Sequence, residues 1–76
     1  MNERVRHILG LVLEMPEQQI DESLTAEDAG NWDSIRHLNL VMALEETFGV
    51  SFSSDELGTL TSYQAIADAL AKRGVA

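Results

Sequence analysis

The sequence contains no cysteine, a single proline and few basic side chains. Without cysteine the chain has no disulfide, no thiolate ligand for zinc and no thiol nucleophile of its own. Its 5 Lys and Arg stand against 13 Asp and Glu, which gives a formal net charge of −8. That charge argues against nucleic acid and anionic membranes as primary partners, because both would repel the chain. We therefore expect partners with basic surfaces.

Long apolar runs are also missing, because Glu14 and Pro16 interrupt the first one. A membrane span needs about 20 apolar residues in a row, and the core of a secretory signal needs roughly 7–15. We therefore expect a soluble, cytoplasmic protein. The 76 residues suit one domain, residues 1–76, whose hydrophobic fraction of 45% is enough for a small core. Such a domain has no room for a deep active site as well, so we expect no enzyme activity.

Three segments have helical spacing of apolar residues. The first has apolar side chains at positions 5, 8, 9, 12 and 13, and Pro16 ends it. The second runs from Ser34 to Phe48, with Asp33 as its N-cap and Gly49 after its C-terminus. The third begins near residue 61 and ends before Gly74. These segments predict three main helices.

The remaining segments connect these helices. Thr61 and Gln64 have the spacing of a capping box for the last helix, and Ser54 is expected to cap a short turn before it. The stretch 17–33 is a long acidic connection that Ile20 and Leu24 would attach to the core. We predict an all-α fold: a small four-helix bundle of three main helices and a short third helix, with a long loop between helices 1 and 2.

The helix that begins at Ser34 has two apolar faces. One consists of Leu40, Val41, Leu44 and Phe48, and the other, on the opposite side, of Ile35, Leu38 and Met42. A helix in a small bundle does not easily bury both faces, so the second is left for a partner or a ligand. The alternative is that the long connection folds over Leu38 and Met42.

The negative charge is concentrated in the middle of the chain. Residues 20–56 contain nine acidic and one basic side chain, a difference of −8 that equals the net charge of the whole chain. Glu45 and Glu46 of this stretch flank the second apolar face, an arrangement that suits docking onto a basic surface. Alternatively, these charges only keep a small protein soluble.

Ser34 lies where a helix begins. A phosphate ester at this position would meet unpaired N–H groups and the positive end of the helix dipole. Position alone nevertheless favours an ordinary first-turn serine.

The surrounding residues, from Asn31 to Val50, resemble the acyl carrier protein family. Asp33-Ser34-Ile35 is close to the family signature Asp-Ser-Leu, the run Leu-Val-Met-Ala-Leu-Glu-Glu follows at 40–46, and Phe48-Gly49 closes the helix. The resemblance extends over nearly the full chain, because members of the family are four-helix domains of this size with a long first loop.

The resemblance implies that Ser34 is the attachment point of 4′-phosphopantetheine. A phosphopantetheinyl transferase would transfer this group from coenzyme A, and its thiol would then hold an acyl or aminoacyl group as a thioester. Asp33 would help to position Mg²⁺ during this loading. The side chains that would contact the transferase and later acyl-loading and acyl-transferring enzymes are Ile35, Leu38 and Met42, with Glu45 and Glu46 facing basic patches. We expect the carrier to be a monomer.

Three residues depart from the pattern of fatty acid synthesis. Arg36, His37 and Asn39 occupy positions where those carriers usually have acidic residues. Together with Trp32 they favour a carrier of a specialised pathway, of the polyketide or nonribosomal peptide type. A carrier of general fatty acid synthesis and an unmodified acidic docking module remain as alternatives.

Other chemistry fits less well. A calcium-binding EF-hand loop starting at Asp21 would have Ala26 where glycine is needed and Trp32 where glutamate is needed. His7 and His37 are isolated and more typical of ordinary side chains than of a metal site. A hydrolase built on Ser34 and His37 would lack an acidic partner and an oxyanion loop.

Overall fold

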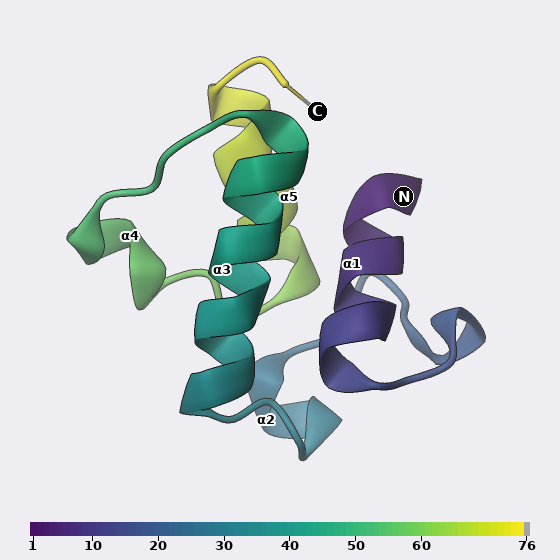
Figure 1. Ribbon diagram of the computed structural model, residues 1–76. Helices are drawn as coiled ribbons and strands as arrows, with labels where there is room; N and C mark the ends of the chain where they lie inside the picture. The colour runs from purple at the N-terminus through teal and green to yellow at the C-terminus, as the bar shows by residue number, and fades with distance from the viewer. Residues whose placement is uncertain (76) are drawn as a thin grey trace.

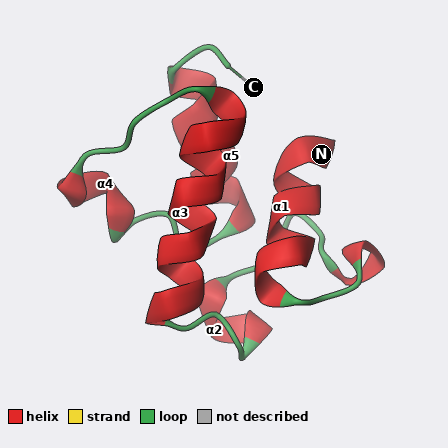
Figure 2. Ribbon diagram, in the orientation of Figure 1, coloured by secondary structure: helices red, strands yellow, loops and turns green. Residues whose placement is uncertain are grey.

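Three long helices form the frame of the molecule: α1 (Glu3–Leu13), α3 (Ser34–Phe48) and α5 (Tyr63–Lys72) (Figure 1). The structure, a computed structural model, describes residues 1–75. Three single-turn elements join the frame: a 3-10 turn (Glu17–Gln19), α2 (Ala26–Ala29) and α4 (Ser54–Leu57). Figure 2 shows that helices and loops make up the whole described chain. The all-α class is confirmed, while α2 and the 3-10 turn are additions to the four predicted helices.

The main helices begin and end at local signals. Asn2 caps α1, because its Oδ1 accepts hydrogen bonds from the backbone N–H groups of Arg4 and Val5. The helix ends at Leu13, and Glu14 takes a left-handed conformation with φ 55° two residues before Pro16. Asp33 and Gly49 are at the two ends of α3, as predicted, with Gly49 at φ 67°.

Two predicted caps are wrong by one residue. The N-cap of α4 is Ser53, which forms a capping box with Glu56, so that Ser54 is already the first helical residue. The N-cap of α5 is Ser62, whose hydroxyl accepts from the N–H of Ala65 at 3.0 Å. Thr61 instead accepts a hydrogen bond through its backbone oxygen, so the predicted box of Thr61 with Gln64 does not form.

The core lies between the three long helices. Leu9 and Leu13 of α1, Leu40 and Leu44 of α3 and Leu70 of α5 are fully buried. The long connection contributes Ile20 and Leu24, which are 1% and 8% exposed, so its predicted attachment to the core is confirmed. None of the helices in the described part of the chain is long and apolar enough to cross a membrane.

A short backbone pairing joins this connection to the start of α5. Thr25 and Ser62 form an isolated antiparallel bridge. On its two sides, the N–H of Ala26 donates to the oxygen of Thr61 at 2.8 Å, and that of Tyr63 donates to the oxygen of Leu24 at 3.0 Å. This pairing holds the start of α2 beside the start of α5, and Figure 1 shows α2 close to the N-terminal end of α3.

Candidate functional site

Ser34 is the first residue of α3 and is exposed. Asp33, directly before it, satisfies the next two donors of the helix: its Oδ1 accepts from the N–H of Arg36 and its backbone oxygen from the N–H of His37, both at 2.8 Å. Within residues 1–75, the N–H groups of Ser34 and Ile35 and the Ser34 hydroxyl have no hydrogen-bond partner. The helix therefore presents unpaired donors beside an exposed hydroxyl, which suits an attached anion.

A cleft of about 260 Å³ opens beside this serine. It lies between the loop before α3, the first turns of α3 and the segment before α5, and it is lined by Ala26, Trp32, Asp33, Ser34, His37 and Thr61. Asp33 and Ser34, predicted from the sequence as site residues, thus share one hollow. Trp32 and His37 also line it, although the sequence analysis predicted no structural role for them there.

His37 connects the loop before Ser34 to α4. The indole N–H of Trp32 donates to Nδ1 of His37 at 3.0 Å, and Nε2 of His37 lies 2.6 Å from the backbone oxygen of Leu57. Both ring nitrogens of His37 are therefore occupied. This leaves neither of them to act as a base for Ser34, which removes the structural basis for a hydrolase.

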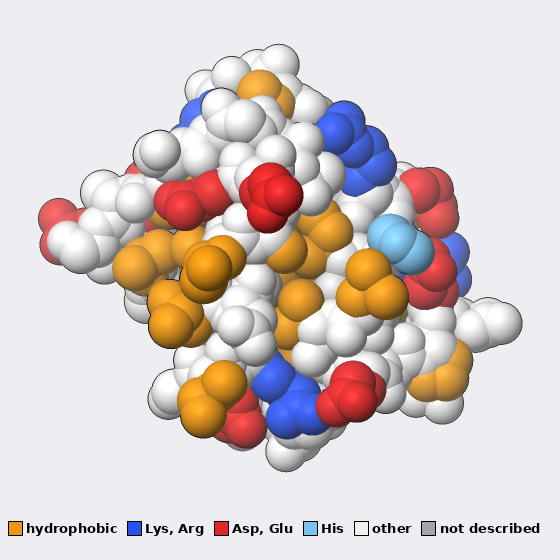
Figure 3. Space-filling model, in the orientation of Figure 1, with side chains coloured by type: hydrophobic (Ala, Val, Ile, Leu, Met, Phe, Trp, Pro, Cys, Tyr) orange, Lys and Arg blue, Asp and Glu red, His pale blue; other side chains and the backbone are white. Residues whose placement is uncertain are grey.

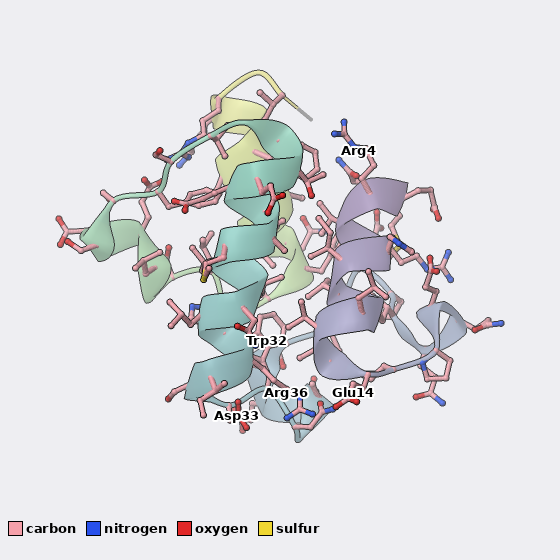
Figure 4. The ribbon with its side chains drawn as sticks, in the orientation of Figure 1. Arg4, Glu14, Trp32, Asp33 and Arg36 are labelled. Atoms are coloured by element: carbon pink, nitrogen blue, oxygen red, sulfur yellow. The ribbon has the colours of Figure 1, made fainter. Side chains whose placement is uncertain are left out.

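Arg36 is the basic residue closest to Ser34 in the sequence. Its guanidinium pairs with Glu14 at the end of α1 and lies 3.6 Å from the carboxylate of Asp33. Figure 4 shows Arg36 between these two acidic side chains. The positive charge beside Ser34 is thus balanced by the protein's own carboxylates, and it joins α1 to the start of α3.

The predicted second apolar face of α3 is exposed. Ile35, Leu38 and Met42 are 74%, 57% and 59% exposed, whereas the opposite face is buried through Leu40, Val41, Leu44 and Phe48. Figure 3 shows apolar side chains gathered on the side of the molecule that α3 occupies. The alternative, in which the long connection covers Leu38 and Met42, is wrong. Whether this face docks partners stays a prediction.

Glu45 and Glu46, which the sequence placed beside this face, differ in their surroundings. Glu45 is half-buried, and its carboxylate accepts a hydrogen bond from the N–H of Phe52 at 2.9 Å. It therefore holds the loop after α3 in place. Glu46 is exposed and presents its charge outward.

His7 has different partners from those of His37. Its Nδ1 is 3.3 Å from a carboxylate oxygen of Glu17 on the 3-10 turn. The part of the chain that the structure describes contains no group of three or more His, Asp and Glu that could hold a metal ion.

A second, larger hollow of about 380 Å³ lies between α1 and α3. Its apolar lining comes from Ile8, Leu11 and Val12 of α1 and from Ala43 of α3. None of the site residues predicted from the sequence lines it, so it does not belong to the site at Ser34.

Comparison with known proteins finds similarity over most of the chain. Residues 3–70 match the family model described as a phosphopantetheine attachment site. The chain is 37% identical over 73 residues to an acyl carrier protein of Buchnera aphidicola subsp. Baizongia pistaciae, covering 95% of this chain and 92% of the relative. It is 39% identical over 67 residues to an acyl carrier protein of Thermosynechococcus vestitus, covering 87% and 82%.

Proposed function

Because the chain belongs to the phosphopantetheine-attachment family of acyl carrier proteins, we propose that Ser34 is the residue to which its covalent 4′-phosphopantetheine is attached. Members of this family are carriers rather than enzymes. The group supplies a terminal thiol that holds acyl groups as thioesters, which a chain without cysteine could not supply itself.

The observation that supports Ser34 most strongly is its place at the start of α3. Its hydroxyl is exposed, and the N–H groups of Ser34 and Ile35 lack partners within residues 1–75. A phosphodiester on this oxygen is an anion beside the positive end of a helix of 15 residues. The donors are in place before loading, so the anion meets a site that needs no rearrangement of α3.

In the loading reaction, the hydroxyl oxygen of Ser34 attacks the phosphorus of coenzyme A that bears pantetheine. A new oxygen–phosphorus bond forms, the hydroxyl proton passes to a base of the transferase, and adenosine 3′,5′-bisphosphate leaves. The residues that this chain contributes are Ser34 as the nucleophile and Asp33, which holds the first turn of α3 by its two hydrogen bonds.

The exposed face of α3 is the docking surface in this proposal. This surface begins one residue after Ser34 and continues along α3, and it consists of Ile35, Leu38 and Met42. The transferase and the acyl-loading and acyl-transferring enzymes would cover them, while the exposed Glu46 meets basic side chains of these partners. The carrier would act in the cytoplasm.

We further propose that the pathway is a specialised one, of the polyketide or nonribosomal peptide type. The support is that Arg36 and His37, in the first turns of α3, have partners within the chain. In addition, residues 34–44 of α3 contain no Asp or Glu. A partner enzyme that relies on several acidic residues there would bind this carrier weakly.

The test is coexpression with a broad-specificity phosphopantetheinyl transferase, followed by intact mass measurement. We expect wild type to gain one phosphopantetheine and Ser34→Ala to gain none while its helical circular dichroism is unchanged. Ser54→Ala is a matched control, because Ser54 is also an exposed serine at the first position of a helix. This variant should be loaded like wild type. Modification of Ser34→Ala, or no modification of wild type by several active transferases, would refute the proposal.

The loaded protein also tests the pathway. Offered to acyl-activating enzymes encoded beside it, the loaded form should gain the mass of the acid that they activate. Efficient acylation by the enzymes of general fatty acid synthesis, with none by the neighbouring enzymes, would instead make it a carrier of fatty acid synthesis.

A further inference from the structure

The two hydrogen bonds of the His37 ring join three segments near Ser34. Trp32 belongs to the loop before the serine, His37 to the first turns of α3, and Leu57 to the end of α4. The rings of Trp32 and His37 are 6.2 Å apart and inclined by 31°. Their contact is therefore the directed N–H to nitrogen bond rather than a stack. Figure 4 shows Trp32 beside the first turns of α3.

The partners of His37 allow only one protonation state. An indole N–H only donates and a backbone oxygen only accepts. Hence Nδ1 of His37 must be the unprotonated acceptor for Trp32, and Nε2 must carry the proton donated to Leu57. This is one tautomer of the neutral ring. A second proton on Nδ1 would face the N–H of Trp32 and remove the acceptor of that half-buried indole.

The charged groups around His37 already have partners of their own. Asp33, in the same cleft, accepts from the N–H of Arg36 and lies 3.6 Å from its guanidinium. On α4, Glu56 is paired with Arg73 of the C-terminal segment, and Asp55 is exposed. The residues that line the cleft from α2 and from the segment before α5 are Ala26 and Thr61, which do not titrate.

We propose that His37 is a positioning residue for loading of the carrier: its neutral ring holds the loop before Ser34 against α4, and its protonation releases that loop and slows attachment of phosphopantetheine. This inference rests on the proposed role of Ser34. It gives His37 a pH-dependent role, because the loop is held in only one of the two charge states of the ring.

The chain offers a direct probe, because Trp32 is its only tryptophan. In the unmodified protein, we expect the Trp32 fluorescence to change in a single one-proton step as the pH is lowered, because the proton added to Nδ1 of His37 removes the acceptor of the indole N–H. His37→Gln should abolish this step, because an amide does not gain a proton there. His7→Gln, the matched control, should retain it. A step that survives in His37→Gln, or no step in wild type with its helical circular dichroism intact, would overturn the proposal.

Loading rates connect this switch to the carrier function. The rates of wild type and His37→Gln are measured by intact mass with one transferase at each pH, so that the pH dependence of the enzyme cancels in their ratio. We expect the ratio to fall about fivefold from about pH 8 to about pH 5, the effect of losing one hydrogen bond. A residue with a merely structural role would give the same ratio at every pH, and that result would overturn the proposal.

Trp32→Phe is a second variant, which keeps an aromatic side chain at position 32 but removes the indole N–H that donates to His37. Its loading rate should resemble that of His37→Gln in its pH dependence, because protonation of His37 then displaces no hydrogen bond. A pH dependence as steep as that of wild type would contradict the inference. Absence of loading in every variant at every pH would refute the role of Ser34 instead, and the fluorescence step would still test the bond between Trp32 and His37.

Discussion

Neighbouring residues of α3 have opposite environments. Val41 is 5% exposed within the core, whereas Met42, the next residue, is 59% exposed. Because each residue advances about 100° around a helix, one step is enough to move a side chain from the core to the outer face. Substitutions at these two positions should therefore affect different properties of the protein.

Met42→Glu should slow loading by the transferase with little loss of stability. The charge would replace an apolar contact of the proposed docking face, while an exposed substitution changes the free energy of unfolding by only about 0.5 kcal/mol. Loading is measured by intact mass and stability by urea denaturation. Leu44→Ala, at a buried position of the same helix, should by contrast cost about 2–5 kcal/mol. Marked unfolding of Met42→Glu would show that this residue belongs to the core.

At this scale the sequence predicted Asp33 and Ser34 but not the contacts of Trp32 and His37. The cap at Asp33 depends only on the residues that follow it, and these are visible in the sequence. The bond from His37 to Leu57 spans 20 residues and depends on where α4 lies. No local pattern contains that information, so the role of His37 required the structure.

Among the elements, the three long helices and the short helix α4 were predictable, whereas α2 and the 3-10 turn were not. The apolar spacing of α1 and α3 repeats over several turns. It therefore predicts which face of each helix is buried and where most of the helix ends lie. The single turns α2 and Glu17–Gln19 are too short for such a period to appear. α2 is instead capped by the hydroxyl of Thr25, which accepts from the N–H of Asp28 at 3.1 Å, and Thr25 also pairs with Ser62 before α5.

The start of α5 offers a test of which residue caps it. Ser62→Ala should lower the free energy of unfolding by about 1 kcal/mol, because the N–H of Ala65 loses its partner. Thr61→Ala is the control: Thr61 is exposed and contributes its backbone oxygen, which alanine keeps. Its effect should stay within about 0.5 kcal/mol by thermal or urea denaturation. The reverse order of the two effects would restore Thr61 as the cap.

For the molecule as a whole, Arg73 joins the C-terminal end of α5 to α4 and to the loop after α3. Its guanidinium lies 2.5 Å from the carboxylate of Glu56 on α4, donates to the backbone oxygen of Ser51, and lies 4.5 Å above the ring of Phe52. The hydrogen bond from Arg73, followed by the one from the N–H of Ser53, lowers the pKa of Glu56 to about 2. Glu56 therefore stays charged far into the acid range.

This lowered pKa predicts how acid acts on the fold. The pKa of Glu56 is depressed from 4.5 to about 2, so its contribution to stability is present above the ordinary value and is lost as the pH falls toward the lower one. Arg73→Gln should therefore lose less stability than wild type over this acid range, measured by urea denaturation at each pH. Lys72→Gln, which removes a neighbouring exposed charge, should behave like wild type. Parallel curves for wild type and Arg73→Gln would contradict the assignment.

The backbone pairing of Thr25 with Ser62 also determines how the molecule transmits mechanical force. If α1 and α5 are pulled apart, tension passes from the first helix along the chain to Leu24, crosses the two hydrogen bonds and continues into Tyr63. Residues 26–61, which include Ser34 and the whole of α3, form a closed loop outside this path. Along the backbone, load therefore reaches Ser34 only after this pairing breaks, so that the contacts of α1 with α3, among them the pair of Glu14 and Arg36, are the direct route by which strain reaches the start of α3.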